Sequence, residues 1–185
     1  MNSLSVYGTR KQHVFAKIEG LAFHKLSLSF LFACLTGIGA MIKFYTPFTP
    51  VPITMQVFFV LLSGALLGRY YGSLSQIMYV GLGMAGISWF ANPAALFGIT
   101  GGYLIGFIVA PYIVDLFKDK SMMLAMLMGI GIIYLFGAIQ FYLLTSLPLN
   151  KVFMLAVMPF IGIDIAKAFA AAGVTKLIDA FHPRL

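Results

Sequence analysis

The sequence predicts an all-α membrane protein with six transmembrane helices. The chain has 185 residues, of which 61% are hydrophobic and only 9% are charged, and its mean hydropathy is +0.99. This composition is far too apolar for a soluble domain of that size. Because a membrane-spanning helix needs about 20 apolar residues, the chain has room for five or six spans with short connections.

Six apolar runs follow one another along the chain. They cover residues 26–44, 53–67, 72–86, 101–117, 122–144 and 160–180. A tight turn at Gly68 and Arg69 is expected to join the second and third runs. Between Pro148 and Pro159 lies an apolar stretch that is too short to span, so we expect it to be re-entrant or interfacial. Residues 26–185 are therefore predicted to form one transmembrane domain.

A proline-rich segment joins the first two runs. Pro47, Pro50 and Pro52 lack backbone donors and fix an extended path. Backbone with unpaired polar groups cannot face lipid. We therefore expect this segment to be a stiff loop, either at the membrane surface or folded over a cavity as a lid.

The distribution of basic residues predicts the orientation of the helices. Of the 12 Lys and Arg residues, Lys167 lies within the sixth run, two lie on one side of the predicted spans and nine on the other. The two are Lys43 and Lys151, and the nine are Arg10, Lys11, Lys17, Lys25, Arg69, Lys118, Lys120, Lys176 and Arg184. Because basic loops stay in the cytoplasm, both termini are predicted to be cytoplasmic. The basic residues thus relate to topology and do not indicate a nucleic-acid partner.

Residues 1–25 form a basic N-terminal tail ahead of the first run. They lack the early apolar core of a cleavable signal, so we expect them to be retained on the cytoplasmic side. Within the tail, apolar residues such as Val14, Ile18 and Leu21 recur at helical spacing. This spacing fits an amphipathic helix lying on the membrane surface, and a disordered tail is the alternative.

The sixth run contains a carboxylate and an ammonium, Asp164 and Lys167. Residues three apart on a helix share one face and can contact each other. Charged groups at membrane depth are costly, and they usually face the bundle interior and mark a ligand or ion site. We therefore predict that this pair binds a ligand. The alternative is an ion pair that only holds helices together, close to a helix start whose dipole stabilises an acid.

The link between the third and fourth runs adds polar candidates on the same predicted side of the membrane. It carries Trp89 and Asn92. The Asn92 amide offers both a donor and an acceptor to a ligand. The same residue also fits the turn that precedes Pro93, which is its alternative role.

The remaining patterns argue against an enzyme or a metalloprotein. The three histidines lie in tails with no partner at metal-ligand spacing. Cys34 is the only cysteine, which excludes a disulfide framework. The glycines of residues 81–86 lack the βαβ context of a dinucleotide site, and the sequence has no Walker loop. No metal or cofactor is therefore predicted, and any ATP-driven step must come from a partner.

Three stretches of the sequence resemble a known family. They are PFTPVPITMQVFFVLLSGALLG at 47–68, LFGITGGYLIGF at 96–107 and PFIGIDIAKA at 159–168. These stretches resemble the BioY family, the biotin-binding S components of energy-coupling-factor (ECF) transporters. The resemblance implies a six-helix S-component fold in the cytoplasmic membrane, with an outward-facing biotin site and no enzymatic activity. It implies a transmembrane coupling subunit and a pair of ATPases as partners.

The resemblance also implies roles for individual residues. The polar anchors for biotin align with Asp164, Lys167 and Asn92. The candidates for the cavity wall or lid are Trp89, Tyr103, Gln56 and Pro50, and the candidate strip for docking the coupling subunit is Ala33 and Gly37. Two other functions stay open, namely an S component for another vitamin, such as thiamine or riboflavin, and a membrane scaffold braced by the ion pair.

Overall fold

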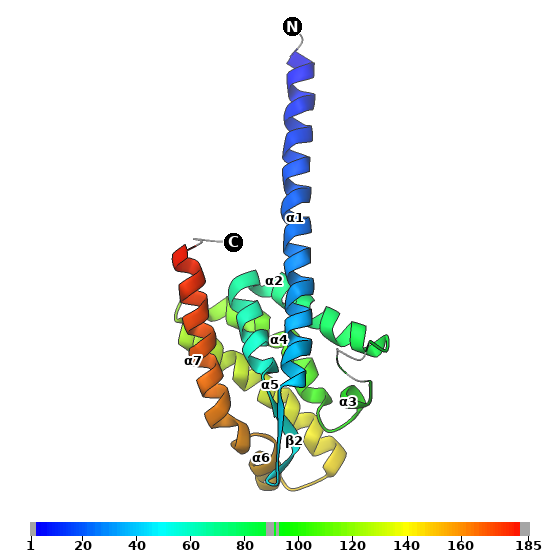
Figure 1. The fold of residues 1–185 in the computed structure, drawn as a ribbon, viewed down its shortest axis with the longest axis vertical. Coiled ribbons are helices and arrows are strands. Elements are labelled where there is room, and N and C mark those ends of the chain that lie inside the picture. Colours follow the sequence, from blue (N-terminus) through cyan, green and yellow to red (C-terminus); the bar gives the residue numbers. More distant parts are fainter. Residues whose placement is uncertain (1–2, 88–90, 92, 182–185) are drawn as a thin grey trace.

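The computed structural model describes residues 3–87, 91 and 93–181, with side chains from residue 22 onward in these ranges. This part of the chain forms seven helices and a two-stranded sheet (Figure 1). The elements are α1 (Ser3–Met41), β1 (Lys43–Thr46), β2 (Thr49–Thr54), α2 (Gln56–Met84), α3 (Pro93–Phe97), α4 (Gly101–Phe117), α5 (Met122–Thr145), α6 (Leu149–Ala156) and α7 (Met158–Phe181). The fold is therefore almost entirely helical, with one exception at the proline-rich segment.

The long apolar helices confirm the prediction of a helical membrane protein. Among the described residues, three helical stretches are long and apolar enough to cross a bilayer: Ala22–Met41 within α1, the whole of α2, and α5. A fourth arises if α6 and α7, which are bent by 41° at a short break, form one span. Helix α4 is apolar but shorter, with 17 residues. The count of six spans stays a prediction.

Helix α1 is continuous over 39 residues, so the predicted tail and the first span are one helix. Figure 1 shows its N-terminal part projecting beyond the other helices. Residues 3–25 are therefore helical here, in contrast to the disordered alternative. The placement of this part on a membrane surface stays a prediction.

One face of α1 packs closely against α2. The Ser29 hydroxyl donates to the Tyr71 carbonyl of α2 at 3.0 Å, Ala33 is completely buried, and Gly37 is buried as well. Small residues at four-residue spacing allow two helices to approach closely. In this structure the strip packs two helices of the same chain. Docking of a partner on Ala33 and Gly37, which stays a prediction, would require α2 to move away.

The proline-rich segment forms an antiparallel hairpin and not an irregular loop. Lys43 lies opposite Thr54, and Phe44 lies opposite Ile53. In a two-stranded sheet both strands are edge strands. Proline, which cannot donate a hydrogen bond to a neighbouring strand, is tolerated at such an edge. The hydroxyl of Thr49 donates to the Leu155 carbonyl of α6 at 2.6 Å. The hairpin is therefore extended, as predicted, and attached to a helix distant in sequence.

Helix α2 contains a sharp break at Gly68, where the predicted turn between the second and third runs lies. The backbone of Gly68 has φ 77° and ψ 179°, whereas the residues on both sides are helical. Glycine adopts this conformation readily because it has no Cβ. The direction of α2 changes there, between its cyan and green parts in Figure 1. The predicted turn is confirmed.

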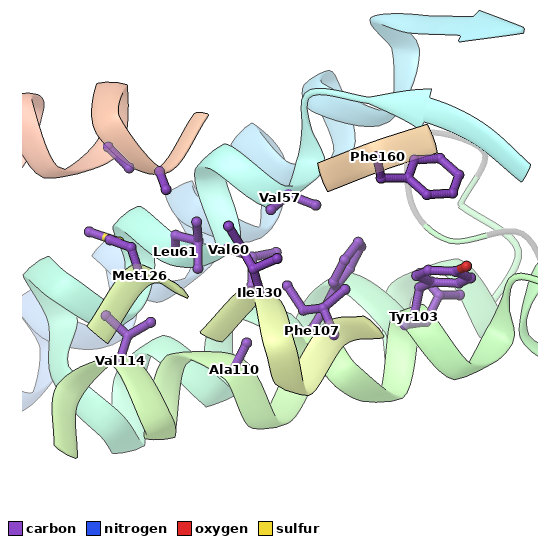
Figure 2. Packing of buried hydrophobic residues seen from close by; sticks show 14 of the residues in the cluster. Val57, Val60, Leu61, Tyr103, Phe107, Ala110, Val114, Met126, Ile130 and Phe160 are labelled. Atoms are coloured by element: carbon purple, nitrogen blue, oxygen red, sulfur yellow. The ribbon is translucent and has the colours of Figure 1, made fainter. Parts of the chain in front are cut away.

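The core lies between α2, α4 and α5 (Figure 2). In Figure 2, Val60 and Leu61 of α2 lie across the cluster from Ala110 and Val114 of α4. Helices α4 and α5 approach closely, because a Cβ added to Gly106 would lie only 2.7 Å from the Cα of Ile133. Glycine at this position thus allows the two helices to pack closely.

Candidate functional site

The site is organised around the ion pair of α7. Nζ of Lys167 lies 2.6 Å from Oδ1 of Asp164. Asp164 and Lys167 are only 3% and 6% exposed, respectively. The spacing of three residues places both side chains on one face of α7, as the sequence predicts. An isolated buried charge would be very costly, and here each of the two charged groups has the other as its partner.

Two further elements complete the environment of the pair. The Lys167 ammonium also donates to the Thr54 carbonyl at the end of β2, at 2.6 Å. The Tyr134 hydroxyl of α5 donates to Oδ2 of Asp164 at 2.8 Å. Hydrogen bonds to charged groups in a low-dielectric interior are strong. The pair is therefore held in one geometry by α5, α7 and the hairpin.

The pair borders a cavity of about 460 Å³, within the range of small-molecule sites. Its wall is mainly apolar and comes from α2, α4, α5 and α7 through side chains such as Val57, Leu104, Ile133 and Phe160. The hairpin supplies another part of the wall. The proline-rich segment thus folds over a cavity, which is one of the two placements that the sequence predicts.

Two more polar groups lie in the wall. The Gln56 amide donates to the Tyr79 hydroxyl at 2.8 Å and its oxygen accepts from the Thr54 hydroxyl at 2.9 Å. The Tyr103 hydroxyl donates to the Ala156 carbonyl at 2.5 Å. The Tyr103 ring packs edge-on against Phe160, with ring centroids 6.2 Å apart, and both rings lie at one end of the core cluster in Figure 2. Tyr103 therefore offers its ring to the cavity while its hydroxyl bonds to the chain itself.

Comparison with known proteins places the chain in a family. Residues 10–184 match the sequence profile of the BioY family. The chain belongs to the BioY family. It is 44% identical to a protein named "Probable biotin transporter BioY" from Pyrococcus horikoshii, over 84% of this chain and 96% of the relative. It is 38% identical to "Biotin transporter BioY" from Thermotoga maritima, over 77% of this chain and 88% of the relative.

A solved structure supports the same fold. The crystal structure of the S-component for biotin from an ECF-type ABC transporter superposes with a TM-score of 0.79. The superposition covers 87% of this chain and 93% of that chain, at 22% sequence identity. At this identity the likeness shows the fold, and it confirms that this BioY-family chain has an S-component fold.

The structure brings together some of the predicted site residues but not all of them. Asp164, Lys167, Gln56 and Tyr103 all line one cavity. Pro50 is exposed and does not line it. Pro50 directly follows Thr49, near the turn of the hairpin, so this structure does not include it in the wall. Its role in a lid stays a prediction.

Two predicted residues lie outside the described residues, namely Trp89 and Asn92. Their flanking residue Ala91 is described and lines the cavity. Ala95 of α3 lines the cavity as well. The link between α2 and α4 thus reaches the site, and the roles of Trp89 and Asn92 in ligand binding stay predictions.

Sequence reasoning missed Tyr134 and Lys43. Tyr134 lies within the apolar run that became α5, and no local pattern relates it to Asp164, which is 30 residues away. Lys43 served only to predict orientation, although it lines the cavity. A cation next to the proline-rich segment on the predicted outer side was the signal that could have identified it.

Proposed function

We propose that this chain is the biotin-specific S component of an ECF transporter, which binds biotin with high affinity on the extracytoplasmic side for uptake into the cell. The names of its relatives support this function. The observation that carries the proposal is the buried Asp164–Lys167 pair at the wall of a cavity of small-molecule size. A purely structural ion pair does not need an adjoining cavity.

The chemistry of biotin matches this wall. Its ureido ring has two N–H donors and one carbonyl acceptor, and its thioether ring and valerate arm are mainly apolar. Asp164 can accept from a ureido N–H, and Lys167 can donate to the ureido oxygen. The apolar side chains around the cavity suit the rest of the molecule. Asn92, from the link that reaches the cavity, is the third proposed anchor.

The proposed topology has six spans and both termini in the cytoplasm of a multi-pass protein of the cytoplasmic membrane. The six spans would be α1, the two segments of α2 on either side of Gly68, α4, α5 and α7. Figure 1 supports an even number of crossings, since the start of α1 and the end of α7 lie at one end of the molecule and the hairpin and α6 at the other. The excess of basic residues at the former end supports its cytoplasmic location.

The proposed partners are a transmembrane coupling subunit and a pair of ATPases. The sequence contains no nucleotide-binding loop, so this chain has no motor of its own. A protein that only captures and releases its ligand is a transporter subunit and not an enzyme. In this proposal residues 1–25 lie on the cytoplasmic side, and residues 26–185 form the biotin-binding domain.

Biotin binding to the purified protein in detergent tests the proposal. We expect biotin to raise the melting temperature and to bind in calorimetry. Asp164→Asn and Lys167→Ala should each weaken binding at least about 100-fold, because loss of one partner of a buried pair costs about 3–5 kcal/mol. Stabilisation by thiamine or riboflavin in place of biotin would contradict the biotin assignment. Absence of binding by any of the three vitamins would favour the scaffold.

A further inference from the structure

A second lysine lies on the wall of the cavity, at its exposed side. Lys43 of β1 is exposed and lines the cavity. It lies opposite Thr54 in the hairpin, and residues directly opposite each other in an antiparallel pair share one face. Tyr45, Pro52 and Thr54 also line the cavity. The side of the hairpin that carries Lys43 therefore borders the cavity, together with Val51 from the other side of β2.

The charge of Lys43 is not neutralised by the protein in the described part of the chain. There, no carboxylate lies within ion-pair distance of its ammonium, which lies 5.8 Å from the centroid of the Tyr45 ring. Among the described residues, two ammonium groups and one carboxylate line the cavity, which gives this lining a net charge of +1. Because Lys167 and Asp164 compensate each other, this positive charge belongs to Lys43.

The buried end of the cavity does not suit an anion. Lys167 already donates to Asp164 and to the Thr54 carbonyl, which uses two of its three N–H donors. A ligand carboxylate placed there would lie beside the negative charge of Asp164, and like charges in a poorly hydrated site repel strongly. A neutral group with both donors and an acceptor matches this end better.

We infer that Lys43 binds the carboxylate of the ligand, so that the ureido ring lies at Asp164 and Lys167 and the valerate arm runs toward the hairpin. This inference rests on the proposed function, because it concerns how biotin is oriented in the same cavity. It makes Lys43 a specificity-determining residue. The chain then distinguishes free biotin from derivatives whose carboxylate is blocked, such as biotinamide.

Calorimetry with biotin and biotinamide on the full-length protein tests the orientation. We expect the unmodified protein to bind biotin about fivefold more tightly than biotinamide, the size expected of a partly exposed ion pair. Lys43→Gln should remove this preference by weakening biotin binding alone, while Lys43→Arg should keep it. The preference should shrink as the salt concentration rises, since exposed charge pairs are screened.

Lys151→Gln provides a matched control. Lys151 lies in α6, is exposed, and is not among the residues that line the cavity. The control removes the same charge from the same predicted side of the membrane, so it should leave the preference for biotin unchanged. An equal effect of the two substitutions would show that only the overall charge matters and would overturn the role of Lys43.

Other outcomes separate this inference from the proposed function. If the unmodified protein binds biotin and biotinamide equally, or if Lys43→Gln keeps the preference, the orientation is wrong and biotin binding itself stands. If neither compound binds, both the proposed function and this inference fail. Because Lys43 is exposed, its substitution is expected to leave the fold intact, and the melting temperature without ligand checks this.

Discussion

The Tyr134 hydroxyl in the middle of α5 donates a hydrogen bond of 2.8 Å to Oδ2 of Asp164 in α7. Lys167 occupies the other carboxylate oxygen at 2.6 Å. Asp164 is thereby oriented by two donors from two helices before any ligand arrives. A site whose polar groups are fixed in advance loses less entropy on binding. This arrangement is the basis of the first two predictions.

Tyr134→Phe should weaken biotin binding and lower the stability of the protein. The substitution keeps the ring but leaves one oxygen of a buried carboxylate without its donor, which costs about 1–3 kcal/mol. Calorimetry and thermal unfolding in detergent measure the two effects. Tyr142→Phe is the matched control in the same helix, because Tyr142 is exposed and lies away from the cavity. Equal effects of the two substitutions would contradict a role for the Tyr134 hydroxyl.

Replacing both members of the ion pair should separate stability from binding. Asp164→Asn or Lys167→Met alone should lower the free energy of unfolding by about 3–5 kcal/mol, whereas Asp164→Leu with Lys167→Met should recover most of that loss. The double variant should still fail to bind biotin. Thermal unfolding and calorimetry on the same preparations distinguish the two results, and retained biotin binding would contradict the assignment of the anchors.

Two exposed residues of opposite charge on the same helix provide the control for this experiment. Lys176 and Asp179 are both exposed and have the same spacing of three residues in α7. Their replacement by Met and Leu should change the free energy of unfolding by less than about 1 kcal/mol, because exposed pairs contribute little.

Thr49→Val should speed up the release of biotin. Its hydroxyl connects the hairpin to the Leu155 carbonyl of α6 at 2.6 Å. Loss of this bond should lower the free energy of unfolding by about 1 kcal/mol and raise the dissociation rate roughly fivefold, since the hairpin forms part of the cavity wall. A filter assay with labelled biotin gives the dissociation rate.

Thr46→Val is the control for the hairpin. The Thr46 hydroxyl is buried, and it has no hydrogen-bond partner in the described part of the chain. Its removal should leave the dissociation rate unchanged and should not lower the melting temperature, because no bond is lost. A faster release in both variants would indicate a general loosening of the hairpin and would contradict the role given to Thr49.

Gly68→Ala should destabilise the turn within α2. At φ 77° and ψ 179° the backbone is in a region that is almost exclusive to glycine, and a side chain there costs about 1–3 kcal/mol. Gly81→Ala is the control in the same helix, because an added Cβ at Gly81 would have no atom within 4 Å. There alanine should be neutral or slightly stabilising, as expected in a helix. Thermal unfolding compares the two variants, and an equal loss of stability would show that the conformation of Gly68 is not the cause.

The sequence alone determined that the protein is a helical membrane protein and that Asp164 and Lys167 form the charged pair within it. Hydropathy and the spacing of prolines and glycines located most of the apolar helices and the turn at Gly68, because these features depend on residues close together in the chain. The charges of Asp164 and Lys167 stood out because they are costly in an apolar run. Their spacing of three residues then predicted their contact, since the geometry of a helix is regular.

Only the tertiary structure decided which distant residues surround that pair. The pair is contacted by Tyr134 of α5 and Thr54 of β2, and its cavity is lined by Lys43 of β1. No local pattern encodes such contacts, because they depend on how separate elements pack. The pairing of the proline-rich segment into a hairpin also depended on two short strands finding each other. The packing of α1 on α2 likewise decided that Ala33 and Gly37 are buried, since a strip of small residues can accommodate a helix of its own chain as well as one from a partner.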